Sequence, residues 1–110
     1  MDQKRRKELV RAYRDAPRPM GVFRVCCAAT GRSLVQASPD LPSALNRQRA
    51  QLSLGGHPDK ALQADWERYG AEGFVFEVLD SLAPKDDPAY DPASDLEALL
   101  EMWRDRLAQG

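Results

Sequence analysis

The single histidine of the chain, His57, lies in the stretch GGHPDKALQADWERYG, which runs from Gly55 to Gly70. An imidazole can act as a general base near neutral pH, and it can also make a contact at the end of a helix. Pro58 suits the first position of a helix, and Asp59 complements the positive helix end. The residue types therefore permit two roles for His57, a catalytic base or a helix cap.

Basic side chains form the second group with possible chemistry, because Lys and Arg can neutralise the phosphates of a nucleic acid. Residues 1–54 carry 11 of the 16 Lys and Arg against 4 acidic residues, whereas residues 55–110 carry 5 against 13. The candidate phosphate contacts are Arg5, Arg6, Arg11, Arg47 and Arg49. The alternative is that these are solvated helix faces, and a net charge of −1 is low for a general nucleic-acid binder.

The two cysteines and the hydropathy of the chain exclude several classes of site. Cys26 and Cys27 are adjacent, so on a strand their side chains point to opposite faces, and we expect free thiols in a reducing compartment. With one histidine they lack the paired spacing of a zinc site. No apolar run approaches the roughly 20 residues of a membrane helix. We therefore expect a cytoplasmic protein with no membrane partner.

Hydrophobic periodicity predicts a single domain over residues 1–110 of α/β (α+β) class, in the order α-β-β-α-α-β-α. A basic leading helix is expected over residues 1–16. A hairpin, two helices and a third strand follow over residues 20–82, an exposed loop over 83–93 and a C-terminal helix over 94–109. Ser38 or Asp40 is expected to cap the first of the two central helices, Gly70 to end the second, and Ser94 with Glu97 to form a capping box.

The predicted core collects the apolar positions of these elements around the sheet. Arg24 and Glu77 are expected to point outward from it. The expected core residues are Val22, Val25, Leu34, Leu45, Leu62, Trp66, Phe74, Phe76, Val78, Leu99 and Trp103.

The hairpin that begins MGVF, the helix after it, the stretch HPDKALQADWERYG and the strand FVFEVL together resemble the GIY-YIG nuclease superfamily. The likeness is closest to small stand-alone bacterial members and runs from the first helix to Trp103. It implies a small, mainly antiparallel three-stranded sheet flanked by helices. It also implies phosphodiester hydrolysis, in which one tyrosine from each of two motifs positions water, an arginine holds the phosphate and a glutamate binds a divalent metal.

Matched to that pattern, the expected catalytic side chains are replaced by apolar ones. Arg47 lies within i+3 reach of the arginine position, and Glu101 meets the metal position only if the last helix slips by one residue. His57 keeps the residue type of its family site position, and we expect it to be a remnant that now caps a helix. The replaced positions are Phe23 and Leu34 for the two tyrosines, Ala44 for the arginine and Leu100 for the glutamate.

Three hypotheses about function follow from the resemblance and from these replacements. The first is a catalytically inactive nuclease-fold protein that binds DNA or RNA through its basic N-terminal half. The second is a protein-interaction or structural module in which apolar side chains fill the cleft that holds the active site in the family. The third is a weak endonuclease that uses Mg²⁺ or Mn²⁺ with Arg47, His57 and Glu101 as relocated parts. We expect the first, with no cofactor unless the protein is active.

Overall fold

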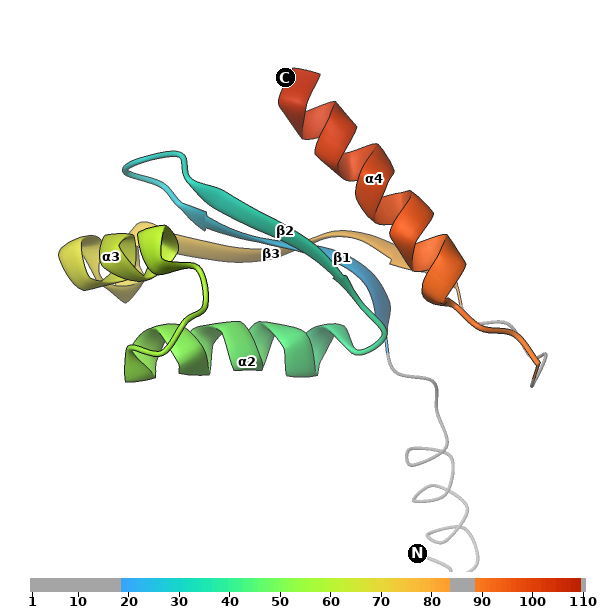
Figure 1. Ribbon diagram of the computed structural model, residues 1–110, viewed down its shortest axis with the longest axis horizontal. Coiled ribbons are helices and arrows are strands. Elements are labelled where there is room, and N and C mark those ends of the chain that lie inside the picture. The colour runs from blue at the N-terminus through green and yellow to red at the C-terminus, as the bar shows by residue number, and fades with distance from the viewer. Residues whose placement is uncertain (1–18, 84–88, 110) are drawn as a thin grey trace, which may run out of the picture.

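The computed structural model describes residues 19–83 and 89–109, so the leading helix expected over residues 1–16 lies outside the described part. The described chain follows the predicted order of elements (Figure 1). These are β1 (Met20–Cys27), β2 (Ser33–Ser38), α2 (Leu41–Leu54), α3 (Lys60–Tyr69), a short 3-10 turn η1 (Ala71–Gly73), β3 (Phe74–Leu82) and α4 (Ala93–Gln109).

The three strands form one antiparallel sheet in the order β2-β1-β3, which confirms the predicted α+β class. The central strand β1 places Val25 opposite Leu34 of β2 and Phe76 of β3. At its start β1 comes so close to β3 that a Cβ atom on Gly21 would lie 2.0 Å from the carbonyl oxygen of Asp80. Glycine is therefore required at this position of the hairpin.

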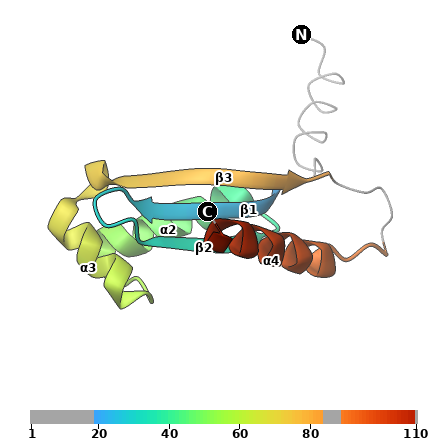
Figure 2. The same cartoon turned by 90° about the horizontal axis from the view of Figure 1, so that it is seen from above.

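Helices cover both faces of the sheet, α2 and α3 on one face and α4 on the other (Figures 1 and 2). On the first face, side chains of β1 and β3 form the main core with Leu41 and Leu52 of α2 and Leu62 of α3. On the second face, the indole Nε1 of Trp103 in α4 donates to the Asp80 carboxylate at 3.0 Å. None of the described helices is long and apolar enough to cross a membrane.

Most of the predicted core is confirmed. Val22, Val25, Leu62 and Phe74 are buried, and the other members apart from Val78 are half-buried, four of them against the main core. The prediction was wrong for Val78, which is 49% exposed because β3 is an edge strand and α2 packs on β1 and β2. Arg24 and Glu77 are half-buried partners in an ion pair between β1 and β3.

The central helices have side-chain caps that hold their first turns. The Asp40 carboxylate accepts from the backbone N–H of Ser43 at 3.2 Å and from its hydroxyl at 2.9 Å, which confirms Asp40 as the N-cap of α2. Helix α3 begins at Lys60, two residues after Pro58, because Asp59 is its N-cap and accepts from the N–H of Leu62 at 3.1 Å. The expected helical position of Pro58 was therefore wrong.

The other helix ends differ in part from the predictions. Helix α4 begins at Ala93, whose N–H donates to the Asp91 carboxylate at 3.0 Å, so Ser94 lies inside the first turn and the predicted capping box was wrong. Gly70 follows the last residue of α3 as predicted, with a positive φ of 74° but with ψ of 177°, outside the left-handed helical region.

Candidate functional site

His57 is buried, with 5% of its surface exposed, at the junction between α2 and α3. Its Nδ1 accepts the backbone N–H of Asp59 at 3.0 Å, and its Nε2 lies 2.5 Å from Oε1 of Gln48. Because Nδ1 accepts a hydrogen bond and Oε1 can only accept, the imidazole proton must be on Nε2. Both ring nitrogens are therefore bonded inside the protein, and neither is open to solvent or to a metal ion.

Two buried glutamines complete the polar junction around His57. The side chain of Gln63 in α3 accepts the backbone N–H of His57 at 3.2 Å and donates to the carbonyl oxygen of Leu52 at 3.0 Å. Gln48 reaches His57 from the middle of α2. In the described chain no buried side-chain nitrogen or oxygen lacks a hydrogen-bond partner. The junction of His57, Gln48 and Gln63, here called the histidine junction, thus ties α3 to α2.

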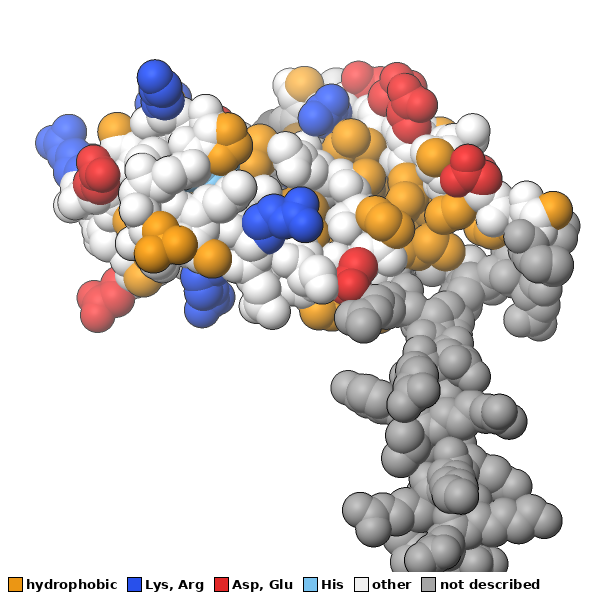
Figure 3. All heavy atoms as spheres, turned by 60° about the horizontal axis from the view of Figure 1, so that its bottom comes forward, with side chains coloured by type: hydrophobic (Ala, Val, Ile, Leu, Met, Phe, Trp, Pro, Cys, Tyr) orange, Lys and Arg blue, Asp and Glu red, His pale blue; other side chains and the backbone are white. Residues whose placement is uncertain are grey.

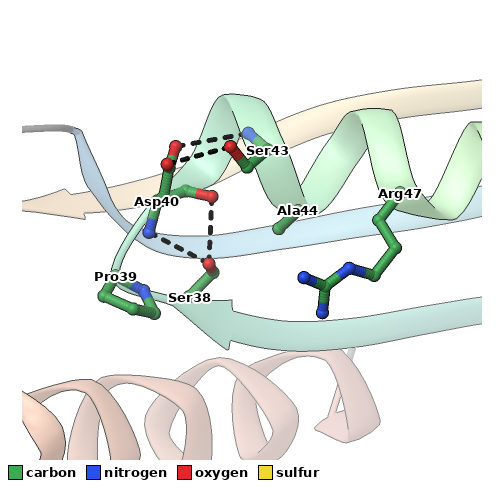
Figure 4. Close-up of a pocket in the computed structure, with 6 residues that line it drawn as sticks. All are labelled: Ser38, Pro39, Asp40, Ser43, Ala44 and Arg47. Atoms are coloured by element: carbon green, nitrogen blue, oxygen red, sulfur yellow. Dashed lines mark hydrogen bonds between the residues drawn. The ribbon is translucent and has the colours of Figure 1, made fainter.

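An open hollow of about 380 Å³ lies where β2 ends and α2 begins (Figure 4). The Ser38 hydroxyl bonds to both the N–H and the carbonyl oxygen of Asp40, at 3.0 Å each, which fixes the turn between the two elements. Figure 4 shows the Arg47 side chain extending from α2 toward β2. Ser38, Pro39, Asp40, Ser43, Ala44 and Arg47 line what we call the α2 hollow.

The guanidinium of Arg47 differs from the other polar groups of the α2 hollow in the contacts that it makes with the described residues. Within residues 19–83 and 89–109 it makes no hydrogen bond and no ion pair, whereas the Asp40 carboxylate holds Ser43. A guanidinium without a partner at an open surface can bind an anion such as a phosphate.

Three of the positions that the resemblance assigned to catalysis lie in one apolar cluster. Phe23 is 1% exposed and belongs to the main core, and Leu34 and Ala44 pack against that core half-buried. Leu100 lies on α4, which covers the opposite face of the sheet (Figure 2). The structure thus brings three of these side chains together as packing and places the fourth on the other side of the sheet.

Comparison with known proteins gives the fold a name. No family model and no curated protein matches the sequence. Two solved structures are similar: a point mutant of the catalytic domain of intron endonuclease I-TevI, and the catalytic domain of homing endonuclease I-TevI. The mutant has a TM-score of 0.65 and 16% sequence identity, and the match covers 82% of this chain and 84% of the mutant chain. The other structure has a TM-score of 0.64 and 17% identity, and the match covers 81% of this chain and 88% of that chain. This chain has the GIY-YIG fold.

On this GIY-YIG fold, the described residues do not fit the divalent metal that the resemblance implies. No group of three or more His, Cys, Asp or Glu side chains that could hold an ion occurs among them. Leu100 is half-buried and Glu101 is exposed. This is the orientation expected when the last helix is matched to the family without a one-residue slip, so that Leu100 and not Glu101 takes the metal position. Cys26 and Cys27 are free thiols, as predicted.

The predicted nucleic-acid contacts do not converge in the described part of the GIY-YIG domain. Arg47 extends toward β2, whereas the Arg49 guanidinium lies 4.6 Å from the ring centroid of Phe76 in β3. Figure 3 shows the basic side chains of this face separated from one another, with hydrophobic side chains gathered on the right. Arg5, Arg6 and Arg11 lie outside the described residues.

Sequence reasoning missed the two glutamines of the histidine junction. On α2, Gln48 lies among buried positions that include Leu41 and Leu52, and on α3 Gln63 follows the buried Leu62. A polar amide on an otherwise apolar helix face needs a buried partner, so it was a usable signal. The sequence does not identify His57 as this partner, because His57 lies in the turn after α2 and the hydrophobic pattern does not predict the conformation of that turn.

Proposed function

We propose that this GIY-YIG-fold protein does not hydrolyse phosphodiesters and that it binds the phosphate backbone of DNA or RNA at the α2 hollow. The observation that carries the first half of the proposal is the engagement of both ring nitrogens of His57 within the histidine junction. A general base must reach the proton that it removes, and neither nitrogen of this imidazole is available.

The chemistry of phosphodiester hydrolysis strengthens the proposal. The scissile phosphate is anionic, so its hydrolysis needs a base, a cation and a metal that together offset the developing charge. At the positions matched to the family, Phe23 supplies no hydroxyl and Ala44 no guanidinium, and both pack into or against the main core. Their packing stabilises the fold. Full burial of a large apolar side chain such as Phe23 contributes about 1.5–3 kcal/mol to the free energy of unfolding.

Two features of the α2 hollow support phosphate binding. The guanidinium of Arg47, which has no partner among the described residues, provides the cation, and the hollow is open to solvent. The N–H of Leu41 at the start of α2 donates to the carbonyl oxygen of Pro19 at 2.9 Å. Pro19, the first described residue, therefore lies beside the start of α2.

Fluorescence anisotropy with labelled duplex and single-stranded oligonucleotides tests the binding at two salt concentrations. We expect salt-sensitive binding that Arg47→Gln weakens, with the slope of log K against log salt reduced by about 0.9 for a duplex. Arg49→Gln is the matched control, because Arg49 is on the same helix but stacks on Phe76. Absence of salt-sensitive binding at micromolar protein, or equal losses in both variants, would contradict the proposal.

Incubation of supercoiled plasmid with the full chain and Mg²⁺ or Mn²⁺ tests the loss of catalysis. We expect the plasmid to stay supercoiled. Nicking by the wild type that disappears in His57→Ala would restore the hypothesis of a weak endonuclease.

An interaction module is the second candidate function, and the exposed side chains of Val75 and Val78 on β3 favour it. The anisotropy titration separates the two candidates, since a module that binds only protein gives no salt-sensitive signal with either oligonucleotide.

A further inference from the structure

The lining of the α2 hollow contains one formal charge of each sign. Arg47 carries the positive charge and Asp40 carries the negative one, while the other lining residues are uncharged. A ligand in the hollow therefore meets a cation and an anion together. The attraction of the guanidinium for a phosphate is offset in part by the repulsion of the carboxylate, and the offset grows with the charge on the ligand.

The Asp40 carboxylate is held in the hollow because it is the N-cap of α2. One of its oxygens accepts the N–H of Ser43 at 3.2 Å, and the other accepts the Ser43 hydroxyl at 2.9 Å (Figure 4). The backbone of Asp40 is held as well, because its N–H and its carbonyl oxygen both bond to the Ser38 hydroxyl at 3.0 Å. The carboxylate cannot turn away from an incoming anion without losing the helix cap.

The start of α2 has no backbone N–H group left for a phosphate. Free N–H groups at a helix N-terminus are a common source of donors in phosphate sites. Here the residues of the first turn that have an N–H all donate it to acceptors in the described chain; they are Asp40, Leu41, Ser43 and Ala44. Pro42, the remaining residue of this turn, has no N–H.

The hydroxyl groups of the hollow are also in use. The Ser38 hydroxyl donates to the carbonyl oxygen of Asp40, and the Ser43 hydroxyl donates to its carboxylate. Of the described residues that line the hollow, Arg47 alone has donors that are not bonded within the protein. The hollow thus offers one guanidinium to a phosphate and no further donor.

We infer that Asp40 is a specificity-determining residue, through which the α2 hollow selects the phosphodiester inside a strand and rejects the phosphate monoester of a strand end or a nucleotide. The inference rests on the proposed phosphate binding at this hollow. A diester carries one negative charge, which a guanidinium can meet with two parallel hydrogen bonds. A monoester carries a charge of about −1.5 to −2 at pH 7. Its additional charge meets the Asp40 carboxylate and finds no second cation, so the selection comes from a repulsive element.

Fluorescence anisotropy with two short strands of one sequence tests this selection at a fixed ionic strength. Both strands carry the label at the 3′ end, and they differ only in a 5′-hydroxyl or a 5′-phosphate group. The wild type should bind the two strands equally. Asp40→Asn removes the charge and keeps the cap, because Asn caps a helix as well as Asp does. This variant should bind the 5′-phosphate strand about fivefold or more tightly than the 5′-hydroxyl strand.

Asp59→Asn is the matched control, because Asp59 is the N-cap of α3 and does not line the α2 hollow. It removes the same charge and should leave the ratio of the two affinities at the wild-type value. The preference of Asp40→Asn for the 5′-phosphate strand should disappear when Arg47→Gln is added, since Arg47 provides the cation.

Two results would overturn the inference and leave the proposed function in place. One is a wild type that binds both strands and prefers the 5′-phosphate strand. The other is binding in which Asp40→Asn and Asp59→Asn give the same ratio of affinities. If the wild type binds neither strand, the proposed function fails, and the inference that rests on it fails too.

Discussion

The histidine junction and the α2 hollow are the two polar regions at the ends of α2, and they differ in how their polar groups are satisfied. In the histidine junction, every ring nitrogen and both glutamine side chains bond within the protein. In the α2 hollow, the Arg47 guanidinium has no partner in the described chain. The difference separates polar residues that stabilise the fold from one that is available to a ligand.

The largest expected effect is on stability, from His57→Ala. This change leaves the buried Oε1 of Gln48 and the N–H of Asp59 without partners, and it also leaves a cavity, so the free energy of unfolding should fall by about 2–4 kcal/mol. Urea unfolding followed by the fluorescence of Trp66 and Trp103 measures it. Arg47→Ala is the control from the other region and should change stability by less than about 0.5 kcal/mol. Equal losses in both variants would remove the distinction between the regions.

Gln63→Leu sharpens the comparison within the histidine junction. It removes the acceptor of the His57 N–H and the donor to the carbonyl oxygen of Leu52. The free energy of unfolding should therefore fall by about 1–3 kcal/mol. The double variant with His57→Ala should lose less than the sum of the two single losses, because both changes loosen the same turn between α2 and α3. Additive losses in the same urea titration would show that Gln63 acts independently of His57.

A smaller loss of stability than at the histidine junction is expected from Asp40→Ala at the α2 hollow. Loss of this N-cap should cost about 1 kcal/mol. The same change removes a negative charge from the lining of the hollow that Arg47 also lines, so the affinity for an oligonucleotide should rise. Anisotropy and urea unfolding on the same preparation measure both quantities. Weaker binding by the variant would place the phosphate contact outside the α2 hollow.

The fold could be predicted from the sequence because its signals are local. The alternation in GVFRVCCA and FVFEVL predicted strands, Asp40 marked a helix start and the His-Pro to Tyr-Gly stretch supported the resemblance. Local rules failed where a distant group changed the outcome. Val78 follows a core pattern, yet the order β2-β1-β3 leaves it at an edge, and Asp91 displaced Ser94 from its predicted capping role.

The candidate site could be predicted only as a set of residue types. The expectation that His57 acts at a helix end agrees with its bond to the N–H of Asp59, the residue that caps α3. The bond to Gln48, nine residues earlier on another helix, depends on how α2 and α3 pack. The α2 hollow likewise depends on the turn from Ser38 to Asp40, and no periodicity in the sequence encodes its shape.

Long-range ¹H–¹⁵N spectroscopy of the imidazole tests the central claim most directly, because the chain has one histidine and its ring signals need no assignment. We predict one tautomer with the proton on Nε2 and an Nδ1 that accepts a hydrogen bond, unchanged when Mg²⁺, Mn²⁺ or an oligonucleotide is added. A ring that exchanges between tautomers, or ring nitrogen signals that shift or broaden on addition of the metal, would show an accessible imidazole and contradict the account.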